Sequence, residues 1–341
     1  MGKDEVATHL EVYARSFGAP VREGVRVTAV APDPNGAGFL VRTEDGTFAA
    51  AGVIVATGAL QRPFIPALAE DLPAHIAQVV PYAYRCPAAL PPGVVLLVGS
   101  GQAGCQIAEE LRRAGRSVYL SVGRSWWAPR RYRGQDLSLW LRAVGWFDRT
   151  VDSLPPGART GLPNPQFTGS GGGRDLNVHT LVAEGVVLLG RLLGIQDGTI
   201  TLAPDLAENL AAGDKQAMGT LQAIDDHIRE QRLDALAADP PNYLRPAAEL
   251  ARGTLAELDL NAAGVSNVIW ATGYRPDLGW VQLPVLDPQG CPVQRRGLTA
   301  VPGLYFLGLD WLHSAESGPF AGIGEDAAYL AAQIAKLASA A

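Results

Sequence analysis

Three glycines in a fixed spacing carry the clearest chemical signal in the chain. Gly99, Gly101 and Gly104 form the pattern G-x-G-x-x-G. In a strand-to-helix turn, the first glycine makes the tight bend and the second lets a pyrophosphate approach the backbone, while the third lets the helix pack close to the strand. The pyrophosphate then lies at the helix N-terminus, where free N–H groups and the helix dipole favour an anion. The pattern predicts a dinucleotide site made by Gly99, Ser100, Gly101, Gln102, Ala103 and Gly104.

The residues around these glycines predict the strand and the helix that such a turn needs. Five apolar residues, Val94–Val98, predict a strand buried on both faces, as in the centre of a parallel sheet. Ile107 and Leu111 keep helical spacing behind the glycines, and Gly115 is expected to end the helix. A glycine-rich turn with a purely structural role is the alternative.

The next strand, expected at Ser117–Val122, indicates which dinucleotide binds. Proteins that bind NAD usually place an acidic residue about 20 positions after the glycines, where it holds the ribose 2′-hydroxyl. This chain has no acidic residue there and instead carries Ser121 and Arg124. A hydroxyl and a guanidinium suit the 2′-phosphate of NADP, which arginine binds with two hydrogen bonds. We therefore expect NADP, with the nearby Arg131 and Arg133 in a solvated loop.

The composition excludes several classes of protein. A length of 341 residues predicts about two domains. Apolar and charged contents of 48% and 18% are typical of a soluble globular protein, and a net charge of −6 gives no basic footprint for nucleic acid. The sequence has no signal-peptide pattern and no apolar run long enough for a membrane span, so a cytoplasmic protein is expected. Cys86, Cys105 and Cys291 are far apart and form no C-x-x-C, which argues against a disulfide scaffold, a zinc site and a dithiol redox centre.

Two further strands end in the same small, flexible sequence. Val53–Val55 leads into Ala56-Thr57-Gly58, and Val268–Trp270 leads into Ala271-Thr272-Gly273. A later strand leads into Gly308-Leu309-Asp310, and an aspartate at the C-terminal end of a parallel strand lies where nucleotides bind in such sheets. Together these patterns predict an α/β fold with two Rossmann-like dinucleotide-binding domains.

Other segments predict small antiparallel meanders and helices around these domains. Asn35-Gly36 and Asp45-Gly46 are hairpin signals. The glycine-rich run 169–173 follows no apolar strand and precedes no Lys-Ser/Thr, so it is expected to be a loop rather than a phosphate cradle. The expected meanders are Val25–Val30, Phe39–Thr43 with Thr47–Ala51, and Val186–Leu189, Leu192–Ile195 with Thr199–Leu202; the expected helices are Met1–Phe17, Gln135–Phe147, Asp205–Leu236 and a last one from about Gly322.

The order of these motifs resembles the flavin-containing monooxygenase superfamily, in particular its bacterial two-dinucleotide flavoproteins. The resemblance covers nearly the whole chain and rests on Ala56-Thr57-Gly58, Gly99–Gly104, Ala271-Thr272-Gly273-Tyr274 and Gly308-Leu309-Asp310. It implies FAD as a second nucleotide, NADPH as hydride donor, dioxygen as oxidant and a small organic substrate. Since the cofactor carries this chemistry, the resemblance assigns no catalytic side chain and no metal site.

The resemblance also implies site residues and domain limits. The FAD-binding domain would comprise residues 1–62 and 283–341, and the NADP-binding domain residues 63–282, with an insertion at about 125–260. Ala271, Thr272 and Gly273 would join the NADP site. The FAD site would comprise Ala56, Thr57, Gly58, Gly308, Asp310, Ser317 and Gly318.

Two departures from the family pattern leave the activity open. The family carries a histidine in a Gln-x-His-Ser…Tyr-Arg context; Gln78, Tyr84 and Arg85 fit that frame here, but Val80 and Pro81 occupy the histidine and serine places. An oxidase or a flavin reductase without oxygen transfer is therefore an alternative.

The second departure concerns the first domain. No strand, glycine-rich loop and helix precede Ala56, so this domain is expected to be incomplete at its N-terminus. The chain as written is then expected to bind NADPH without retaining FAD, and a non-catalytic NADP-binding remnant is the third interpretation. Of the histidines, His313 beside Asp310 is an active-site candidate and His75 is expected on the surface.

Overall fold

The computed structural model describes residues 2–36, 38–124, 126–154, 166–239, 241 and 244–340. Contacts between residues divide the chain into two compact units. Unit 1 comprises Met1–Ala56, Asp277–Leu307 and Ala327–Ala341, and unit 2 comprises Thr57–Pro276 and Gly308–Asp326.

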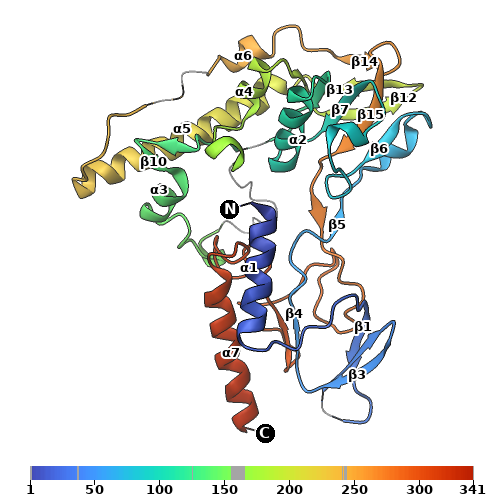
Figure 1. The fold of residues 1–341 in the computed structure, drawn as a ribbon, viewed down its shortest axis with the longest axis vertical. Helices are drawn as coiled ribbons and strands as arrows, with labels where there is room; N and C mark the ends of the chain where they lie inside the picture. Colours follow the sequence, from blue (N-terminus) through green and yellow to red (C-terminus); the bar gives the residue numbers. More distant parts are fainter. Residues whose placement is uncertain are drawn as a thin grey trace. The chain divides into compact units, whose positions relative to one another are not determined.

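A parallel sheet forms the core of unit 2 (Figure 1). Among the described residues it has five strands in the order β11–β8–β7–β15–β6, and every neighbouring pair is parallel. From β7 the chain adds β8 and β11 on one side and later β15 on the other, so the strand order reverses between β7 and β15. Doubly wound sheets bind ligands beyond the carboxyl ends of the strands at such a reversal. The strands are β6 (Ala77–Val79), β7 (Val94–Val98), β8 (Val118–Ser121), β11 (Val187–Leu189) and β15 (Val265–Trp270).

The apolar strand β7 is buried on both faces, as its sequence predicts. Val95 and Leu97 pack in a cluster with helices α2 (Gln102–Arg113) and α4 (Val178–Ala183). Leu96 and Val98 point the other way and pack in a second cluster with Ile200 and Leu258 of an antiparallel meander. Because both faces are covered, β7 carries no polar alternation.

Helix α2 ends as predicted at Gly115, which has a φ of +80°. The amide of Gly115 donates to the carbonyl of Arg112 at 2.9 Å, and the amide of Arg116 donates to that of Leu111 at 2.9 Å. This pair of hydrogen bonds is a Schellman motif, which satisfies carbonyls that the helix end leaves without a partner.

The second meander differs from the prediction in one strand. It consists of β12 (Leu192–Gln196), β13 (Thr199–Leu202) and β14 (Glu257–Asp259). The expected first strand, Val186–Leu189, instead forms β11 (Val187–Leu189), which pairs in parallel with Tyr119–Ser121. Leu188 and Leu189 are both buried, so this segment fits a sheet covered on two faces better than a half-exposed meander.

Helices of unit 2 extend the core away from the sheet. Helix α5 (Leu206–Gln231) packs its first turns in the sheet cluster and its later residues Leu221 and Ile224 against α3 (Leu137–Ala143). Helix α3 is shorter than expected at both ends. Asp136 caps its start, accepting from the amide of Ser138 at 3.0 Å, and Gly145 with a φ of +69° follows its end. The remaining elements of unit 2 are β5 (Arg62–Pro63), η1 (Ala67–Asp71), η2 (Pro87–Ala89), β9 (Arg131–Tyr132), β10 (Gln135–Asp136), η3 (Val151–Ser153), η4 (Ser170–Gly172), α6 (Ala247–Leu250) and β16 (Tyr274–Arg275).

Unit 1 contains the first predicted meander and a pair of parallel strands. Strands β1, β2 and β3 are antiparallel neighbours. Strands β4 and β17 run parallel, with Val55 opposite Phe306. The elements are α1 (Lys3–Ser16), β1 (Val27–Pro32), β2 (Phe39–Thr43), β3 (Gly46–Ala50), β4 (Val53–Val55), β17 (Leu304–Phe306) and α7 (Ile323–Ala340), whose first four residues belong to unit 2.

The predicted amphipathic helix α1 forms, but its apolar face is mostly exposed. Leu10, Tyr13 and Phe17 are 43%, 62% and 63% exposed. In the part of the chain that the structure describes, no helix is both long and apolar enough to cross a bilayer.

The segment 308–326 makes its contacts in unit 2, although the sequence assigns it to the first domain. Ser314 forms an antiparallel bridge with Thr150. The amide of Val151 donates to the carbonyl of His313 at 2.9 Å, and the amide of Ala315 donates to that of Arg149 at 3.0 Å. These hydrogen bonds fix the Gly308–Asp326 segment to the stretch that follows α3.

Candidate nucleotide-binding site

The three glycines after β7 have the steric roles that their spacing predicts. Gly99 has a φ of +108°, and a Cβ there would lie 2.4 Å from the carbonyl oxygen of Ala271. A Cβ on Gly104 would lie 2.0 Å from the carbonyl oxygen of Gly99. On Gly101 a Cβ would meet no protein atom within 4 Å. The turn is therefore closely packed behind Gly99 and Gly104 and open at Gly101.

The N-terminus of α2 presents unused backbone donors at this open position. Gly101 is the N-cap and has no side chain that could accept from the first-turn amides. The first helical hydrogen bond runs from the amide of Cys105 to the carbonyl of Gly101 at 3.0 Å. The first turn of α2 carries no acidic residue, and Gly101 and Gln102 are exposed. An anion at this end would meet free N–H groups and the positive end of the helix dipole.

A short segment that the sequence analysis missed braces the same turn. We call residues 166–168 the strap. The Gln102 side chain bonds both backbone groups of Phe167, accepting from its amide at 2.7 Å, and Gln106 Nε2 donates to the same carbonyl at 2.9 Å. The Gln166 amide group donates to the carbonyl of Ser100. The side chain of Gln102 thus holds the strap. The backbone amide of Gln102 takes no part in this contact and remains available to a ligand.

The only sequence signal for the strap is the pair Gln102 and Gln106, one helical turn apart on α2. Residues 166–168 themselves show no periodicity, and the preceding residues 155–165 lie outside the described part of the chain.

The loop after β8 lies next to the glycine turn. The hydroxyl of Ser100 donates to the carbonyl of Gly123 at 3.4 Å. Arg124 follows Gly123, is exposed, and has no hydrogen bond or ion pair with a described residue. Its guanidinium is therefore available to a ligand at this end of the sheet.

Ser121 is the last residue of β8 and has a structural role in this conformation. Its side chain is buried, donates from Oγ to the carbonyl of Gly190 at 3.0 Å, and accepts from the amide of Leu192 at 3.2 Å. The hydroxyl connects β8 to the turn between β11 and β12.

The later arginines do not form the solvated loop that the sequence indicates. Arg133 donates from Nε to Asp225 Oδ1 at 2.7 Å. Arg131 donates to the carbonyls of Gly172 and Gly173, both at 2.9 Å. Two carbonyls of the glycine-rich run therefore accept from a guanidinium. The hydrogen-bond partners of Arg131 and Arg133 lie far from them in the sequence, so only the fold reveals them.

The second Ala-Thr-Gly segment lies against the first glycine turn. Ala271 follows β15, the neighbour of β7, and its carbonyl is the atom that excludes a Cβ from Gly99. Thr272 donates from Oγ1 to the carbonyl of Phe64, and the amide of Phe64 donates to the carbonyl of Gly273 at 2.9 Å. The three residues thus join the glycine turn to the segment around Phe64.

The first Ala-Thr-Gly segment and the Gly-x-Asp segment follow two parallel strands. Ala56 comes directly after β4, and Gly308 comes two residues after the end of β17. Gly58 and Gly308 adopt positive φ angles of +72° and +74°. In unit 2, Gln61 Nε2 donates to Thr57 Oγ1 at 2.7 Å and to the carbonyl of Gly58 at 2.8 Å.

Asp310, Ser317 and Gly318 come together in one loop of unit 2. A Cβ on Gly318 would lie 2.2 Å from Asp310 Oδ1. Ser317 Oγ accepts from the amides of His313 and Ser314 at 3.0 and 2.9 Å, and the side chain is buried. Partial burial raises the pKa of the Asp310 carboxyl. The loop therefore removes part of the water around this carboxylate, and the loss of water makes the ionised form less favourable.

An aromatic cluster adjoins this loop and was not predicted. The Trp146 ring lies 5.5 Å from that of Trp126 and 6.1 Å from that of Trp311. Trp311 directly follows Asp310 and has a φ of +53°, an uncommon conformation for a bulky residue. From the sequence, these tryptophans can be recognised only as apolar residues. Their rings come together because of how α3 and the 308–326 segment are placed, which local sequence does not reveal.

The two histidines differ in burial. His75 is exposed, as predicted, and its Nε2 lies 2.9 Å from Asn261 Oδ1. His313 is half-buried, with its backbone in the loop described above. Gln78 belongs to the sequence pattern in which the family carries its histidine. Its side-chain oxygen accepts from Trp270 Nε1 at 2.8 Å, so Gln78 makes a structural contact here.

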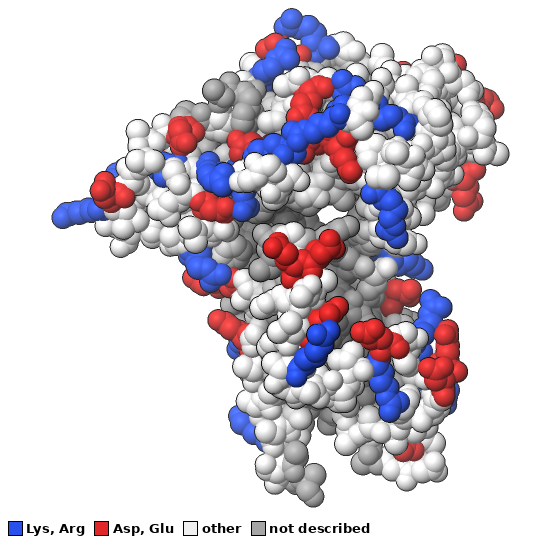
Figure 2. All heavy atoms as spheres, in the orientation of Figure 1, with Lys and Arg blue, Asp and Glu red and all other residues white. Residues whose placement is uncertain are grey.

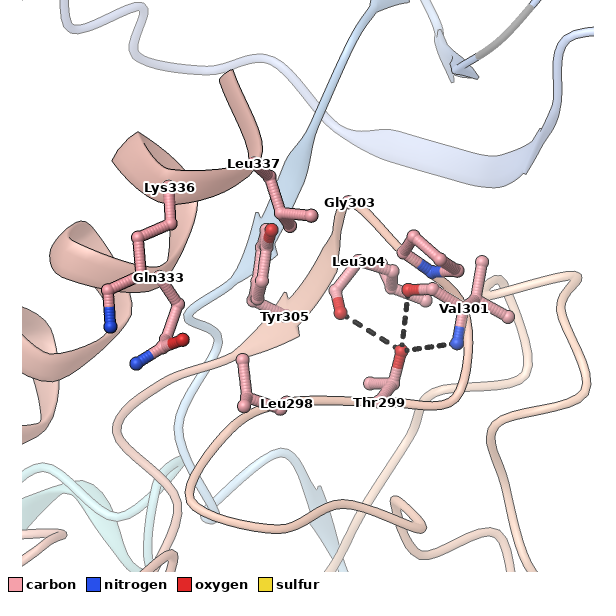
Figure 3. A pocket seen from close by; sticks show the side chains of 10 residues that line it. Leu298, Thr299, Val301, Gly303, Leu304, Tyr305, Gln333, Lys336 and Leu337 are labelled. Carbon is pink, nitrogen blue, oxygen red and sulfur yellow. Dashed lines mark hydrogen bonds between the residues drawn. The ribbon is translucent and has the colours of Figure 1, made fainter. Parts of the chain in front are cut away.

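Unit 1 contains a pocket of about 340 Å³ that is separate from these motifs (Figure 3). The Thr299 hydroxyl donates to the carbonyls of Val301 and Leu304, both at 3.0 Å, so the loop itself uses this group. Gln333 and Lys336 of α7 and Tyr305 of β17 also line it with polar groups, and the apolar lining includes Leu298 and Leu337. None of the predicted nucleotide residues lines it.

Charged side chains on the visible face carry no single sign. Figure 2 shows lysines and arginines interspersed with aspartates and glutamates over this face. Within the described residues, no three His, Cys, Asp or Glu side chains come close enough to hold a metal ion.

Comparisons with known proteins identify the family of this chain. A family model described as pyridine nucleotide-disulphide oxidoreductase matches residues 1–148. A protein of Geobacillus kaustophilus (strain HTA426), described as an uncharacterized oxidoreductase CzcO-like, is 32% identical over 330 residues, which cover 96% of this chain and 76% of that protein. The chain belongs to the CzcO-like oxidoreductase family.

Solved structures resemble the fold of this CzcO-like chain. A mutant flavin monooxygenase from Stenotrophomonas maltophilia is 20% identical with a TM-score of 0.60, over 98% of this chain and 77% of that one. A structure of OTEMO in complex with FAD and NADP is 15% identical with a TM-score of 0.53, over 99% of this chain and 71% of that one. These likenesses show an α/β fold with parallel sheets and antiparallel meanders, as in FAD/NAD(P)-binding flavoproteins.

The open position at Gly101 gives a first prediction. Gly101→Val is expected to weaken NADPH binding about tenfold or more, a loss of at least about 1.4 kcal/mol, because the methyl groups would occupy the space of the pyrophosphate. The fold should persist, since the φ of −73° suits valine and the new Cβ meets no protein atom within 4 Å. Titration of intrinsic fluorescence with NADPH and far-UV circular dichroism measure the two effects.

Gly194→Val in β12 is the matched control, since a Cβ there also meets nothing within 4 Å. This control should bind NADPH like the parent. Parent-like affinity in a folded Gly101→Val protein would contradict the site.

The raised pKa of Asp310 gives a second prediction. The ionised carboxylate is less favourable in the folded state than in the unfolded state, so its contribution to stability is present below the ordinary Asp pKa of about 3.9 and is lost as the pH rises through the raised value. Asp310→Asn should therefore match the parent in Tm near pH 4 and exceed it at pH 7. Taking the difference between the two proteins cancels the other titrating groups. If the Tm of Asp310→Asn instead fell relative to that of the parent as the pH rose, the folded protein would be stabilising the ionised Asp310 carboxylate.

Proposed function

We propose that this CzcO-like chain is an NADPH-dependent FAD oxidoreductase that transfers one oxygen atom of O2 to a small organic substrate. The observation that carries the nucleotide part is the open turn at Gly101, which lies at the reversal of strand order and before an uncapped helix. Support for the flavin part comes from the likeness in fold to flavin monooxygenases and to OTEMO with FAD and NADP.

The NADP site of this proposal consists of backbone donors and one arginine. The pyrophosphate would accept from the amides at the start of α2, namely those of Gln102 and Ala103. Arg124, exposed and without a described partner, would hold the 2′-phosphate with a bidentate pair of hydrogen bonds. Ser121 is left out of this contact, because its hydroxyl is buried and bonded to Gly190 and Leu192.

The FAD site of this proposal uses the turns that follow β4 and β17. Ala56, Thr57 and Gly58 with Gly308, Asp310 and Gly318 would hold FAD near the flavin and the linking phosphates. Ser317 would act indirectly, since its hydroxyl accepts two amides of the loop that carries Asp310. Bound FAD supplies the electron transfer and the oxygen chemistry, so the protein's part is to bind, orient and exclude water.

A second candidate is a flavin reductase or oxidase without oxygen transfer, favoured by Val80 and Pro81 in place of the family's histidine and serine. The disulfide-reducing branch of that class fits poorly. The three cysteines are free, and burial raises the pKa of the Cys105 thiol to about 12. A thiol with so high a pKa forms almost no thiolate, which is the reactive species. A third candidate, an NADP-binding protein without catalysis, shares the turn at Gly101.

The choice of nucleotide can be tested at Arg124. Arg124→Asp should weaken NADPH binding by one to two decades, because lost charge-assisted hydrogen bonds cost about 1.5–3 kcal/mol. NADH lacks the 2′-phosphate, so its affinity should change little. Arg252→Asp, also exposed and in unit 2, controls for the change of net charge. An unchanged ratio of NADPH to NADH affinity in Arg124→Asp would refute this assignment.

The reaction class can be tested by following the oxygen. The natural protein, supplied with FAD, NADPH, 18O2 and methyl phenyl sulfide as a probe, is expected to give sulfoxide that carries one 18O. Recovery of all NADPH electrons as hydrogen peroxide would identify an oxidase. Turnover only with ferricyanide or a quinone would identify a reductase, and absence of both flavin absorbance and NADPH oxidation would identify a binding protein.

A further inference from the structure

Two arginines face each other on a short antiparallel ribbon in unit 2. Strands β5 and β16 pair so that Arg62 lies opposite Arg275 and Pro63 lies opposite Tyr274. Side chains of directly opposed residues lie on the same face of a ribbon, with Cβ atoms about 4.5–5.5 Å apart. Like charges in this position destabilise the pairing. The ribbon therefore carries two positive charges at a cost to its own stability.

One of the two guanidinium groups is held in place by an aromatic ring. The Cζ atom of Arg275 lies 3.9 Å from the centre of the Phe64 ring, a cation–π contact. Phe64 is two residues after Arg62 and shares its face of the strand. Its backbone is fixed by the second Ala-Thr-Gly segment, through Thr272 Oγ1 and the carbonyl of Gly273. The stacked guanidinium keeps its N–H edge free for a ligand.

Neither arginine is neutralised inside the described structure. Arg62 and Arg275 are exposed, and neither guanidinium forms an ion pair or a hydrogen bond with a described residue. Several arginines of unit 2 do pair with carboxylates: Arg133 bonds Asp225, and Arg174 makes a bidentate contact with Glu109 at 2.7 and 2.5 Å. The opposed pair has no such counter-charge among the described residues.

We propose that Arg62, Phe64 and Arg275 form a binding site for an oxyanion, a phosphate or a carboxylate group. Two guanidinium forks on one face match the oxygen geometry of either group and bind it bidentately. An anion between them also offsets their mutual repulsion. In the proposed enzyme the oxyanion has two sources: a phosphate of the bound dinucleotide, or a carboxylate of the substrate. The assignment to either source rests on the proposed function, whereas the oxyanion site itself does not.

The stability of the unliganded protein gives the first test. Arg62→Gln removes the like-charge opposition and keeps the Arg275–Phe64 contact, so its Tm at low ionic strength should rise by about 1–3 °C. Arg229→Gln, an exposed arginine of α5 that pairs with Asp226, should not raise the Tm. A Tm that falls in Arg62→Gln would show that Arg62 serves the fold and would overturn the site.

Ligand binding gives the second test, with probes that need neither FAD nor turnover. Inorganic phosphate and phenylacetate, each compared with sodium chloride at equal ionic strength, should raise the Tm of the parent and of Arg229→Gln. In the double variant Arg62→Gln, Arg275→Gln this specific increase should disappear. Equal increases in the parent and the double variant would refute the proposal, even where the NADPH and oxygen experiments succeed.

Affinity for NADPH then distinguishes the two sources. A loss of about tenfold or more in the double variant assigns the oxyanion to the dinucleotide. Unchanged NADPH affinity together with a lost response to phenylacetate assigns it to a carboxylate-bearing substrate. In Arg62→Lys, the specific Tm increase with phosphate or phenylacetate should be less than half of the increase in the parent, because lysine keeps the charge without the planar fork.

Discussion

The fold of unit 2 depends on how closely three backbone segments approach one another at the start of α2. A Cβ on Gly99 or on Gly104 would come within 2.4 or 2.0 Å of a carbonyl oxygen, distances that no side chain tolerates. Because these positions carry no side chain, α2 lies directly on the ends of β7 and β15, and Ala271 closes the turn from behind. The same approach leaves the other side of the turn, at Gly101, open to a ligand. Packing and binding are thus two consequences of one constraint.

Many polar groups elsewhere in unit 2 attach its long connecting segments to the helices and to one another. Residues 166–168 are fixed to α2 by glutamine side chains, and the 308–326 segment is fixed to the stretch after α3 by backbone hydrogen bonds. Arg174 and Arg133 serve the same purpose through buried or half-buried carboxylates. Arg124 at the proposed 2′-phosphate position, and Arg62 with Arg275 on the ribbon, are among the exposed arginines that form no ion pair with a described residue. Their common feature is a positive charge that the described fold does not neutralise.

The sequence predicts the parts of the fold that depend on local pattern. The strand at Val94–Val98, the glycine turn and the helix end at Gly115 follow from apolar runs and from glycine's conformational freedom. One strand of the second meander was predicted wrongly, because the apolar segment 186–189 looks the same whether it pairs with its neighbour in sequence or with β8. Its true third strand, Glu257–Asp259, comes from about 55 residues later in the chain, and sequence separation hides such pairings.

The candidate site was predictable only where a backbone position, rather than a side-chain partner, decides the outcome. Ser121 lies at the end of the expected strand, yet its hydroxyl bonds Gly190 and Leu192, which no local pattern reveals. The opposition of Arg62 and Arg275 depends on a register between residues far apart in the chain. Pairing, burial and counter-charges are tertiary properties, and they decide which of many arginines remain available to a ligand.

A crystal structure of the protein with NADP+ tests the nucleotide site most directly. Pyrophosphate oxygens are expected within hydrogen-bond distance of the amides of Gln102 and Ala103, over Gly101, and the 2′-phosphate is expected to be held by Arg124. A nucleotide bound elsewhere, or one whose pyrophosphate avoids the N-terminus of α2, would contradict this site.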